Sequence, residues 1–191
     1  MAPTRVLVFA GSIRSGALSV KLAALAAKEL ALADAEVTQI SLADYPLPLY
    51  DGDREESEGI PENATRLARM IAGTQGVFIA TPEYNNSLPP LLKNAIDWVS
   101  RHRHTGSLNY RRRIYATGST SDGPFGGARA LADLRKVLMA GLGAIVLPDK
   151  IEIPHALDAF DEAGELVDER RAKLMKTVCV NLVDFASRLA G

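Results

Sequence analysis

The stretch "RVLVFAGSIRSGALSVKLAALA" (residues 5–26) decides the fold class. It opens with a short apolar run closed by a Gly-Ser pair, which is typical of a buried strand. A turn rich in serine and glycine follows, and then Leu22, Leu25 and Ala26 recur at helical spacing. A buried strand that leads directly into a helix is the repeating unit of α/β proteins, so this class is predicted.

The same unit recurs along the rest of the chain. Apolar runs predict strands over 5–12, 35–42, 76–82, 113–119 and 144–148, and helical patterns predict helices over 19–33, 60–73, 87–101, 126–143 and 167–189. The last helix is expected to bury Val167, Leu174, Val178, Leu182, Phe185 and Leu189. The acidic run 51–58 is predicted to be a solvated loop.

The strands are apolar nearly throughout, so both faces of their sheet should be covered, as in parallel sheets. Five strands in 191 residues favour a flavodoxin-like doubly wound sheet with strand order 2-1-3-4-5. We therefore predict a single α/β domain over residues 1–191.

Composition excludes several classes of protein. The chain is 47% hydrophobic and 24% charged with a net charge of −1, which argues against a nucleic-acid partner. One cysteine, Cys179, rules out an internal disulfide, and the three histidines are not spaced like a zinc site, so no metal is predicted. Neither a signal-peptide pattern nor a membrane-spanning run is evident, so a cytoplasmic protein that does not use a membrane is expected.

Three unusual loops should meet at one edge of this sheet. In the 2-1-3-4-5 order a ligand lies beyond the carboxyl ends of the strands, at the switch between strands 1 and 3. The loops "GSIRSGALS" (11–19) and "TPEYNNS" (81–87) follow those two strands, and "TGSTSDGPFGG" (117–127) lies beside them. They are the most polar, glycine-rich or unusual turns of the chain.

The first loop has the chemistry of a phosphate site. Helix N-termini offer unpaired N–H groups, while Ser12 and Ser19 add hydroxyls and Arg14 adds positive charge. The loop lacks both GxGxxG and GxxxxGK[ST], so a single terminal phosphate suits it better than a dinucleotide or a nucleoside triphosphate. The alternative is that these serines only cap the helix.

The other segments allow two interpretations each. Tyr84 in "PEYN" (82–85) could flank a planar ring, or this stretch could be an ordinary connection between strand and helix. The glycines of 118–129 would let backbone approach a ligand, or form a mobile surface loop. The basic stretch 101–113 is either a solvated loop or a docking surface for the phosphates of NADPH. Cys179 is interpreted as packing in the last helix.

Three segments together carry a family resemblance. "AGSIRSGALS", "TPEYNNSLPPLLKNAIDW" and "GGARALADLR", in that order, resemble the NADPH-dependent FMN reductase family, which includes quinone, azo-dye, chromate and ferric reductases. The resemblance implies a flavodoxin-like fold, noncovalent FMN, NADPH or NADH as co-substrate, and a homodimer or homotetramer.

The resemblance also implies a cofactor site. Its phosphate end would comprise Ser12, Arg14, Ala17, Leu18 and Ser19, and its ribityl and ring end Pro82, Glu83, Tyr84, Asn85 and Ser119. The family often has Ser at the place of Ala17 and Asn at the place of Ser19, so one phosphate hydroxyl is missing unless backbone N–H groups at Ala17 and Leu18 suffice.

The implied activity is an FMN-dependent NAD(P)H oxidoreductase. Hydride would pass from the nicotinamide to N5 of FMN and then to quinones or similar small acceptors such as azo compounds, chromate, ferric chelates or free flavin, with no catalytic side chain. One alternative is a flavodoxin-type electron carrier, although a net charge of −1 does not match the strong acidity of flavodoxins. Another is a flavin-free regulatory module.

Glu83, Asn94, Trp98 and Arg101 suggest an interface between subunits. A helix over 87–101 would be ~22 Å long, so Glu83 before it and Arg101 at its end could not pair within one chain. Antiparallel packing of two such helices would bring them together, with an exposed Trp98 between them. The alternative is that Arg101 only caps its own helix.

Overall fold

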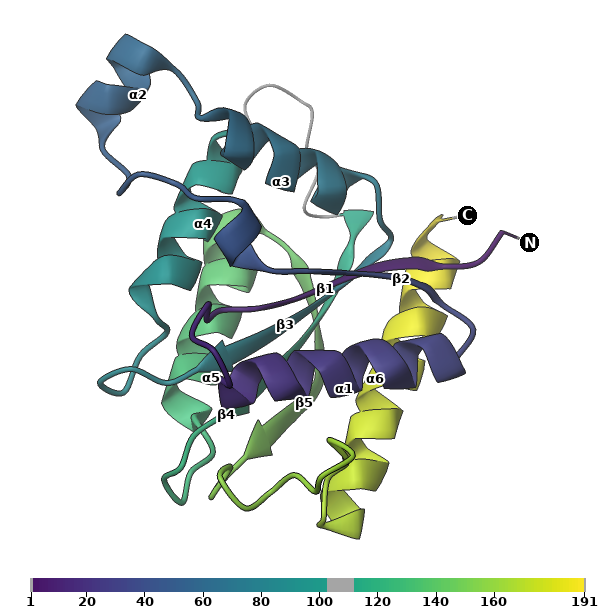
Figure 1. The fold of residues 1–191 in the computed structure, drawn as a ribbon. Coiled ribbons are helices and arrows are strands. Elements are labelled where there is room, and N and C mark those ends of the chain that lie inside the picture. The colour runs from purple at the N-terminus through teal and green to yellow at the C-terminus, as the bar shows by residue number, and fades with distance from the viewer. Residues whose placement is uncertain (1, 103–111, 191) are drawn as a thin grey trace.

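The computed structural model describes residues 2–102 and 112–190. Its centre is a sheet of parallel strands in the order β2-β1-β3-β4-β5 (Figure 1). The strands are β1 (Arg5–Ala10), β2 (Glu36–Ile40), β3 (Gly76–Pro82), β4 (Ile114–Thr120) and β5 (Ile145–Ile153). The flavodoxin-like strand order predicted from the sequence is confirmed.

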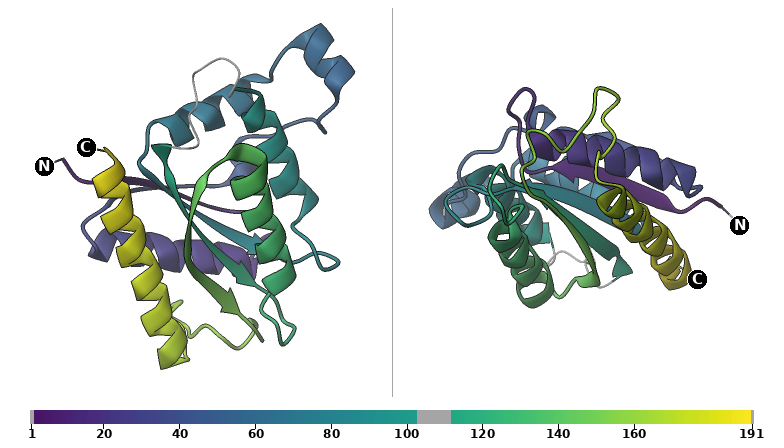
Figure 2. Two further views of the ribbon diagram at one scale, coloured as in Figure 1. Left: turned by 180° about the vertical axis from the view of Figure 1, so that it is seen from behind. Right: turned by 90° about the horizontal axis from the view of Figure 1, so that it is seen from below.

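Helices cover both faces of the sheet (Figure 2). One face carries α1 (Leu18–Leu32) and α6 (Glu169–Ala190), and the other carries α3 (Glu62–Ala72), α4 (Pro90–Ser100) and α5 (Ala128–Lys136). Three shorter elements complete the described fold: η1 (Leu42–Asp44), α2 (Gly52–Glu58) and the wider turns of η4 (Val137–Gly141).

Strand β1 shows why the inner strands of the sheet, β1, β3 and β4, are nearly continuous apolar runs. Val6 and Val8 join the core beneath α1 and α6, while Leu7 and Phe9 join the core beneath α3 and α4. All four side chains are buried, because successive residues of a strand point to opposite faces and both faces are covered.

Two helices differ from the sequence prediction. Helix α4 begins at Pro90 and not at residue 87, because Tyr84 and Ser87 pair across a tight turn before Pro89 caps the helix. The acidic run is not a loop, since Asp51 caps the short helix α2 by accepting from the Asp53 amide. Helix α2 buries no residue, so its sequence lacks the helical spacing of apolar residues from which a helix is predicted.

The C-terminal elements also differ. Strand β5 continues past Pro148 to Ile153 through a bulge, between the pairs Tyr115–Val146 and Thr117–Lys150, and its edge position tolerates the proline. The face predicted for the last helix is confirmed at Val178 and Leu182, which are buried, and is wrong at Val167, Leu174, Phe185 and Leu189, which are exposed. The buried side chains of α6 are Met175, Val178, Cys179, Leu182 and Ala186, which follow the helical period more closely.

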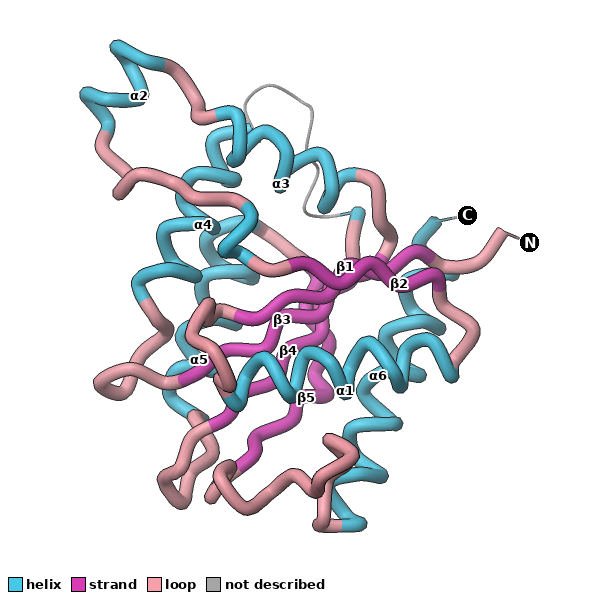
Figure 3. The backbone as a smooth tube through the Cα atoms, viewed as in Figure 1, coloured by secondary structure: helices cyan, strands magenta, loops and turns pink. Residues whose placement is uncertain are grey.

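The parallel arrangement brings the loops after β1, β3 and β4 to one end of the sheet, here called the carboxyl edge (Figure 3). No helix within residues 2–102 and 112–190 combines the length and apolar character needed to cross a membrane.

Candidate functional site

The first loop leaves the N-terminus of α1 open. Ala17 is the N-cap residue and offers no side-chain hydrogen bond, and the first turn of α1 contains no acidic residue. The loop is shaped by its own backbone, since the Ala17 amide donates to the Arg14 carbonyl at 3.1 Å and Gly16 has a φ of 68°. Uncapped N–H groups at a helix N-terminus attract anions.

Ser19 supplies a second, independent sign of a ligand. Its side chain is 1% exposed, and its Oγ has no hydrogen-bond partner among the described residues. A buried hydroxyl without a partner costs about 1–3 kcal/mol, so such groups persist where something else satisfies them. Ser19 lies in the first turn of α1, directly behind the open helix N-terminus.

Ser12 faces a groove beside the same loop. With a volume of about 310 Å³, the groove runs between the ends of β1 and β2 and the start of α1, and Gln39 and Ser41 contribute its other polar side chains. The sequence reasoning missed Gln39 and Ser41. A signal was present, because strand order 2-1-3 places the end of the second strand beside the first loop.

The second loop is a hairpin closed by two backbone hydrogen bonds. The amide of Tyr84 donates to the Ser87 carbonyl and the amide of Ser87 to the Tyr84 carbonyl, both at 3.0 Å. Asn85 and Asn86 form its tip with φ values of 50° and 62°, a conformation that asparagine tolerates well. Tyr84 is 47% exposed, so an aromatic side chain stands in solvent at the carboxyl edge.

The third loop is fixed to the end of β5. The Ser121 amide donates to the Ile153 carbonyl at 3.1 Å, and the amides of His155 and Ala156 donate back to Gly123 and Ser121. Gly126 has a φ of 60°, and a Cβ there would lie 2.8 Å from the backbone of Ile153 and Pro154. These contacts tie the backbone of the third loop to the end of β5.

Ser119 does not present its side chain at the carboxyl edge. It is fully buried in β4, and its hydroxyl donates to the Gly126 carbonyl at 2.7 Å. The expectation that this side chain reaches a ligand needs correction, because its hydrogen bond holds the third loop in place. The backbone of that loop is the part near the edge.

Trp98 is not an exposed interface residue. It is 0% exposed, and its indole N–H donates to the Pro48 carbonyl at 2.7 Å. Asn94 donates to the same carbonyl at 2.9 Å and accepts from the Tyr50 amide at 2.8 Å. Both side chains bind the segment between η1 and α2 (residues 46–50), here called the strap, so they stabilise the chain's own fold.

Arg101 and Glu83 also have partners within the chain. The Arg101 Nε donates to Glu55 Oε1 at 2.8 Å, and the guanidinium lies 5.6 Å from the centre of the Tyr50 ring. Glu83 Oε2 accepts from the Arg129 and Ala130 amides, both at 3.0 Å. Both side chains thus have partners within the chain, and the Glu83–Arg101 pair between subunits stays a prediction.

Part of the basic stretch, residues 103–111, lies outside the described residues. At its end, Arg113 is not a solvated side chain, since it donates to the carbonyls of Ile71 and Ala72.

Two other features are not reactive centres. Burial raises the pKa of the Cys179 thiol, which leaves it protonated and packed against α1. Within the described parts of the chain, no His, Cys, Asp and Glu side chains are grouped as a metal would require.

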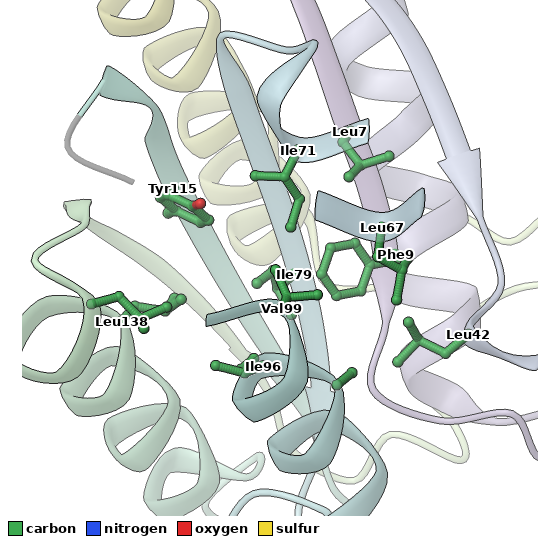
Figure 4. Close-up of a pocket in the computed structure, with 12 residues that line it drawn as sticks. Leu7, Phe9, Leu42, Leu67, Ile71, Ile79, Ile96, Val99, Tyr115 and Leu138 are labelled. Carbon is green, nitrogen blue, oxygen red and sulfur yellow. The ribbon is translucent and has the colours of Figure 1, made fainter. Parts of the chain in front are cut away.

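A pocket beneath α3 and α4 is a gap in the core (Figure 4). It has a volume of about 30 Å³ and is lined by apolar side chains and Tyr115. That volume holds about one water molecule, too little for a planar cofactor. The carboxyl edge is the better candidate.

Fold and site together define a flavodoxin-like α/β protein with a helix N-terminus suited to an anion and an exposed tyrosine at the same end of the sheet. Comparison with known proteins makes the class specific, since residues 4–158 match the model of the NADPH-dependent FMN reductase family. The chain belongs to this family, which confirms the family expected from the sequence.

Similar proteins agree with this assignment. The chain is 37% identical over 171 residues to a quinone reductase of Escherichia coli (strain K12), covering 86% of each chain. It is 32% identical over 188 residues to an NAD(P)H-dependent FMN reductase of Pseudomonas aeruginosa, covering 98% of this chain and 97% of that one. It is similar in structure to FerB, a flavoenzyme NAD(P)H:(acceptor) oxidoreductase from Paracoccus denitrificans, with a TM-score of 0.78, 29% identity and coverage of 97% and 98%.

Replacing Ser19 by alanine should raise the stability of the ligand-free protein and lower its affinity for FMN. Without ligand, the change removes an unsatisfied buried hydroxyl and is expected to raise the free energy of unfolding by up to about 1 kcal/mol. If Ser19 donates to a phosphate, FMN affinity falls about tenfold while riboflavin affinity is unchanged. Urea unfolding and fluorescence titration measure the two effects, and an equal loss of both ligands would contradict the assignment.

Proposed function

We propose that this protein is an FMN-dependent NAD(P)H oxidoreductase that passes hydride to quinones or similar small acceptors. The observation that carries the proposal is the Ser19 hydroxyl behind the open N-terminus of α1, which has no partner in residues 2–102 and 112–190 and lies at the edge where three ligand-type loops converge. Family membership supports the choice of cofactor, and relatives named quinone reductases support the choice of acceptor.

The first loop fits a terminal phosphate. The Leu18 amide, the hydroxyls of Ser12 and Ser19, and the exposed guanidinium of Arg14 would hold it, while the Ala17 amide is already bonded to the Arg14 carbonyl. The loop therefore supplies both hydrogen-bond donors and positive charge, as a phosphate requires. In this proposal the Leu18 amide compensates for the hydroxyl that alanine lacks at position 17.

The hairpin and the third loop fit the rest of the cofactor. Tyr84 would flank the ring, Pro82 and Asn85 would line the ribityl side, and backbone beyond Ser119 would approach the ring. Bound FMN supplies the hydride chemistry, and the side chains of this chain bind and orient it. No nucleophile or general base is required of them.

We also propose a homo-oligomer. Leu49 is 79% exposed on the strap that Asn94 and Trp98 hold, next to the outlying helix α2 (Figure 1). In this proposal Asn94, Trp98 and Arg101 contribute indirectly, by holding the strap and α2 in a fixed shape. Sedimentation velocity tests it, and a single species with the mass of one chain would contradict it.

Because the enzyme would consume NAD(P)H, we further propose a cytoplasmic location.

Arg14 provides a test of the phosphate assignment. Its guanidinium is exposed, so Arg14→Ala should leave the fold intact while removing a charge-assisted bond worth roughly 1.5–3 kcal/mol. FMN affinity is expected to fall about tenfold or more, with riboflavin affinity nearly unchanged. Arg54→Ala on α2 removes the same charge far from the loop and serves as the control. A matched loss for both ligands would place Arg14 outside the phosphate site.

Steady turnover separates an enzyme from an electron carrier. We expect continued NADH or NADPH oxidation when the FMN-loaded protein is mixed with a quinone, and comparison of the two nicotinamides gives the preference. Bound FMN without NAD(P)H turnover would favour the carrier instead. A protein that takes up no FMN would favour a flavin-free module.

A further inference from the structure

Glu83 joins two loops of the site through its side chain. Helix α5 begins after Gly127, which offers no side-chain cap, so the first amides of the helix need another acceptor. The Glu83 carboxylate provides it from 46 residues away, accepting from Arg129 and Ala130 at 3.0 Å each. A carboxylate at this position also interacts favourably with the helix dipole.

A second bond joins the same two segments. The Ser87 hydroxyl donates to Asp133 Oδ2 at 2.6 Å, one turn further along α5. This hydrogen bond, followed by the contact with Lys136, holds the pKa of the Asp133 carboxyl below its usual value. Glu83 precedes the Tyr84–Ser87 hairpin and Ser87 closes it, so both ends of the hairpin are anchored on α5.

The start of α5 is in turn fixed to the sheet. Ser119 binds the Gly126 carbonyl, and a Cβ on Gly127 would lie 3.1 Å from that of Ser119. The hairpin that carries Tyr84 therefore has a defined position relative to the third loop. The Glu83 carboxylate is the charged contact between them.

We propose that Glu83 is a positioning residue, whose carboxylate sets the distance between the Tyr84 hairpin and the 121–127 loop and so preforms the slot for the flavin ring. The inference rests on the proposed function. The sequence predicted that Glu83 contacts the ligand, whereas here its carboxylate binds α5. A preformed slot avoids the ordering cost that a loose pair of loops would add to binding. The role concerns the ring end of the ligand and not the phosphate end.

The test compares Glu83→Ala with Glu83→Gln, which keeps an oxygen that can accept both amides. For Glu83→Ala we expect the affinities for FMN and riboflavin to fall together, by about tenfold, since hydrogen bonds to a charged group are lost. Glu83→Gln should stay within about threefold of the unchanged protein. Glu162→Ala, in an exposed loop away from α5, controls for loss of an acidic charge.

Hydrogen exchange without ligand makes the test independent of the proposed function. The amide protons of Arg129 and Ala130 should exchange slowly in the unchanged protein and in Glu83→Gln, and about tenfold faster in Glu83→Ala. Unchanged protection in Glu83→Ala, or unchanged FMN and riboflavin affinity, overturns the positioning role. If the unchanged protein binds no flavin but the three proteins show this exchange pattern, the proposed function is wrong while the Glu83 contact with α5 is confirmed.

Discussion

Replacing Ala17 by aspartate is expected to lower FMN affinity about a thousandfold and to leave riboflavin affinity nearly unchanged. Ala17 is the N-cap of α1, with extended backbone angles that suit a capping side chain. An aspartate there would place a negative charge beside the proposed phosphate site and would repel the phosphate. Like charges about 4 Å apart cost about 4 kcal/mol near a protein surface, which corresponds to this loss.

Ala17→Asn is the matched control for this prediction. Asparagine has nearly the same size and caps helices as well, but it carries no charge. Both variants should raise the free energy of unfolding of the ligand-free protein by about 1 kcal/mol, while only Ala17→Asp loses most FMN binding. Isothermal titration with FMN and riboflavin measures the difference. Equal losses in the two variants would show that no phosphate binds at this helix N-terminus.

Trp98→Ala should lower the free energy of unfolding by about 3–5 kcal/mol, the usual cost of removing a buried aromatic side chain. Trp98 is 0% exposed, and its ring meets that of Tyr50 edge to face at a centroid distance of 5.0 Å. Its loss would leave a cavity and release the strap that carries Pro48. Urea unfolding gives the value.

Trp98→Phe separates packing from hydrogen bonding. The phenyl ring retains most of the buried area, and the Pro48 carbonyl keeps its bond from Asn94. We expect this variant to lose only about 1 kcal/mol. If Trp98→Ala also costs less than about 1 kcal/mol, Trp98 is an exposed residue, as the sequence alone suggested.

The strand order was predictable because it depends on a local pattern repeated along the chain. Each of the inner strands β1, β3 and β4 is a short apolar run that is followed by a turn and a helix and faces cores on both sides, as Leu7 and Val8 illustrate. The carboxyl edge followed from that order. The helix N-terminus beside Ser12 and Ser19 could therefore be located before any contact was known.

Contacts between distant segments were not predictable in this way. The burial of Trp98 depends on a strap some 50 residues earlier that has no period of its own. Glu83 caps a helix 46 residues later, whereas a capping pattern in sequence spans only a few positions. The extension of β5 past Pro148 depends on its edge position and on Arg135, which donates to the Leu147 carbonyl at 2.8 Å within the bulge.

Anaerobic mixing of the FMN-loaded protein with NADPH or NADH tests the central claim most directly. The proposed function predicts a visible spectrum of bound flavin at about one FMN per chain, which fades after mixing and returns when a quinone is added. The Ala17→Asp variant, prepared in the same way, should retain little flavin and show little change. A protein that binds FMN but whose spectrum does not respond to either nicotinamide would contradict the proposed function, and so would one that binds no FMN.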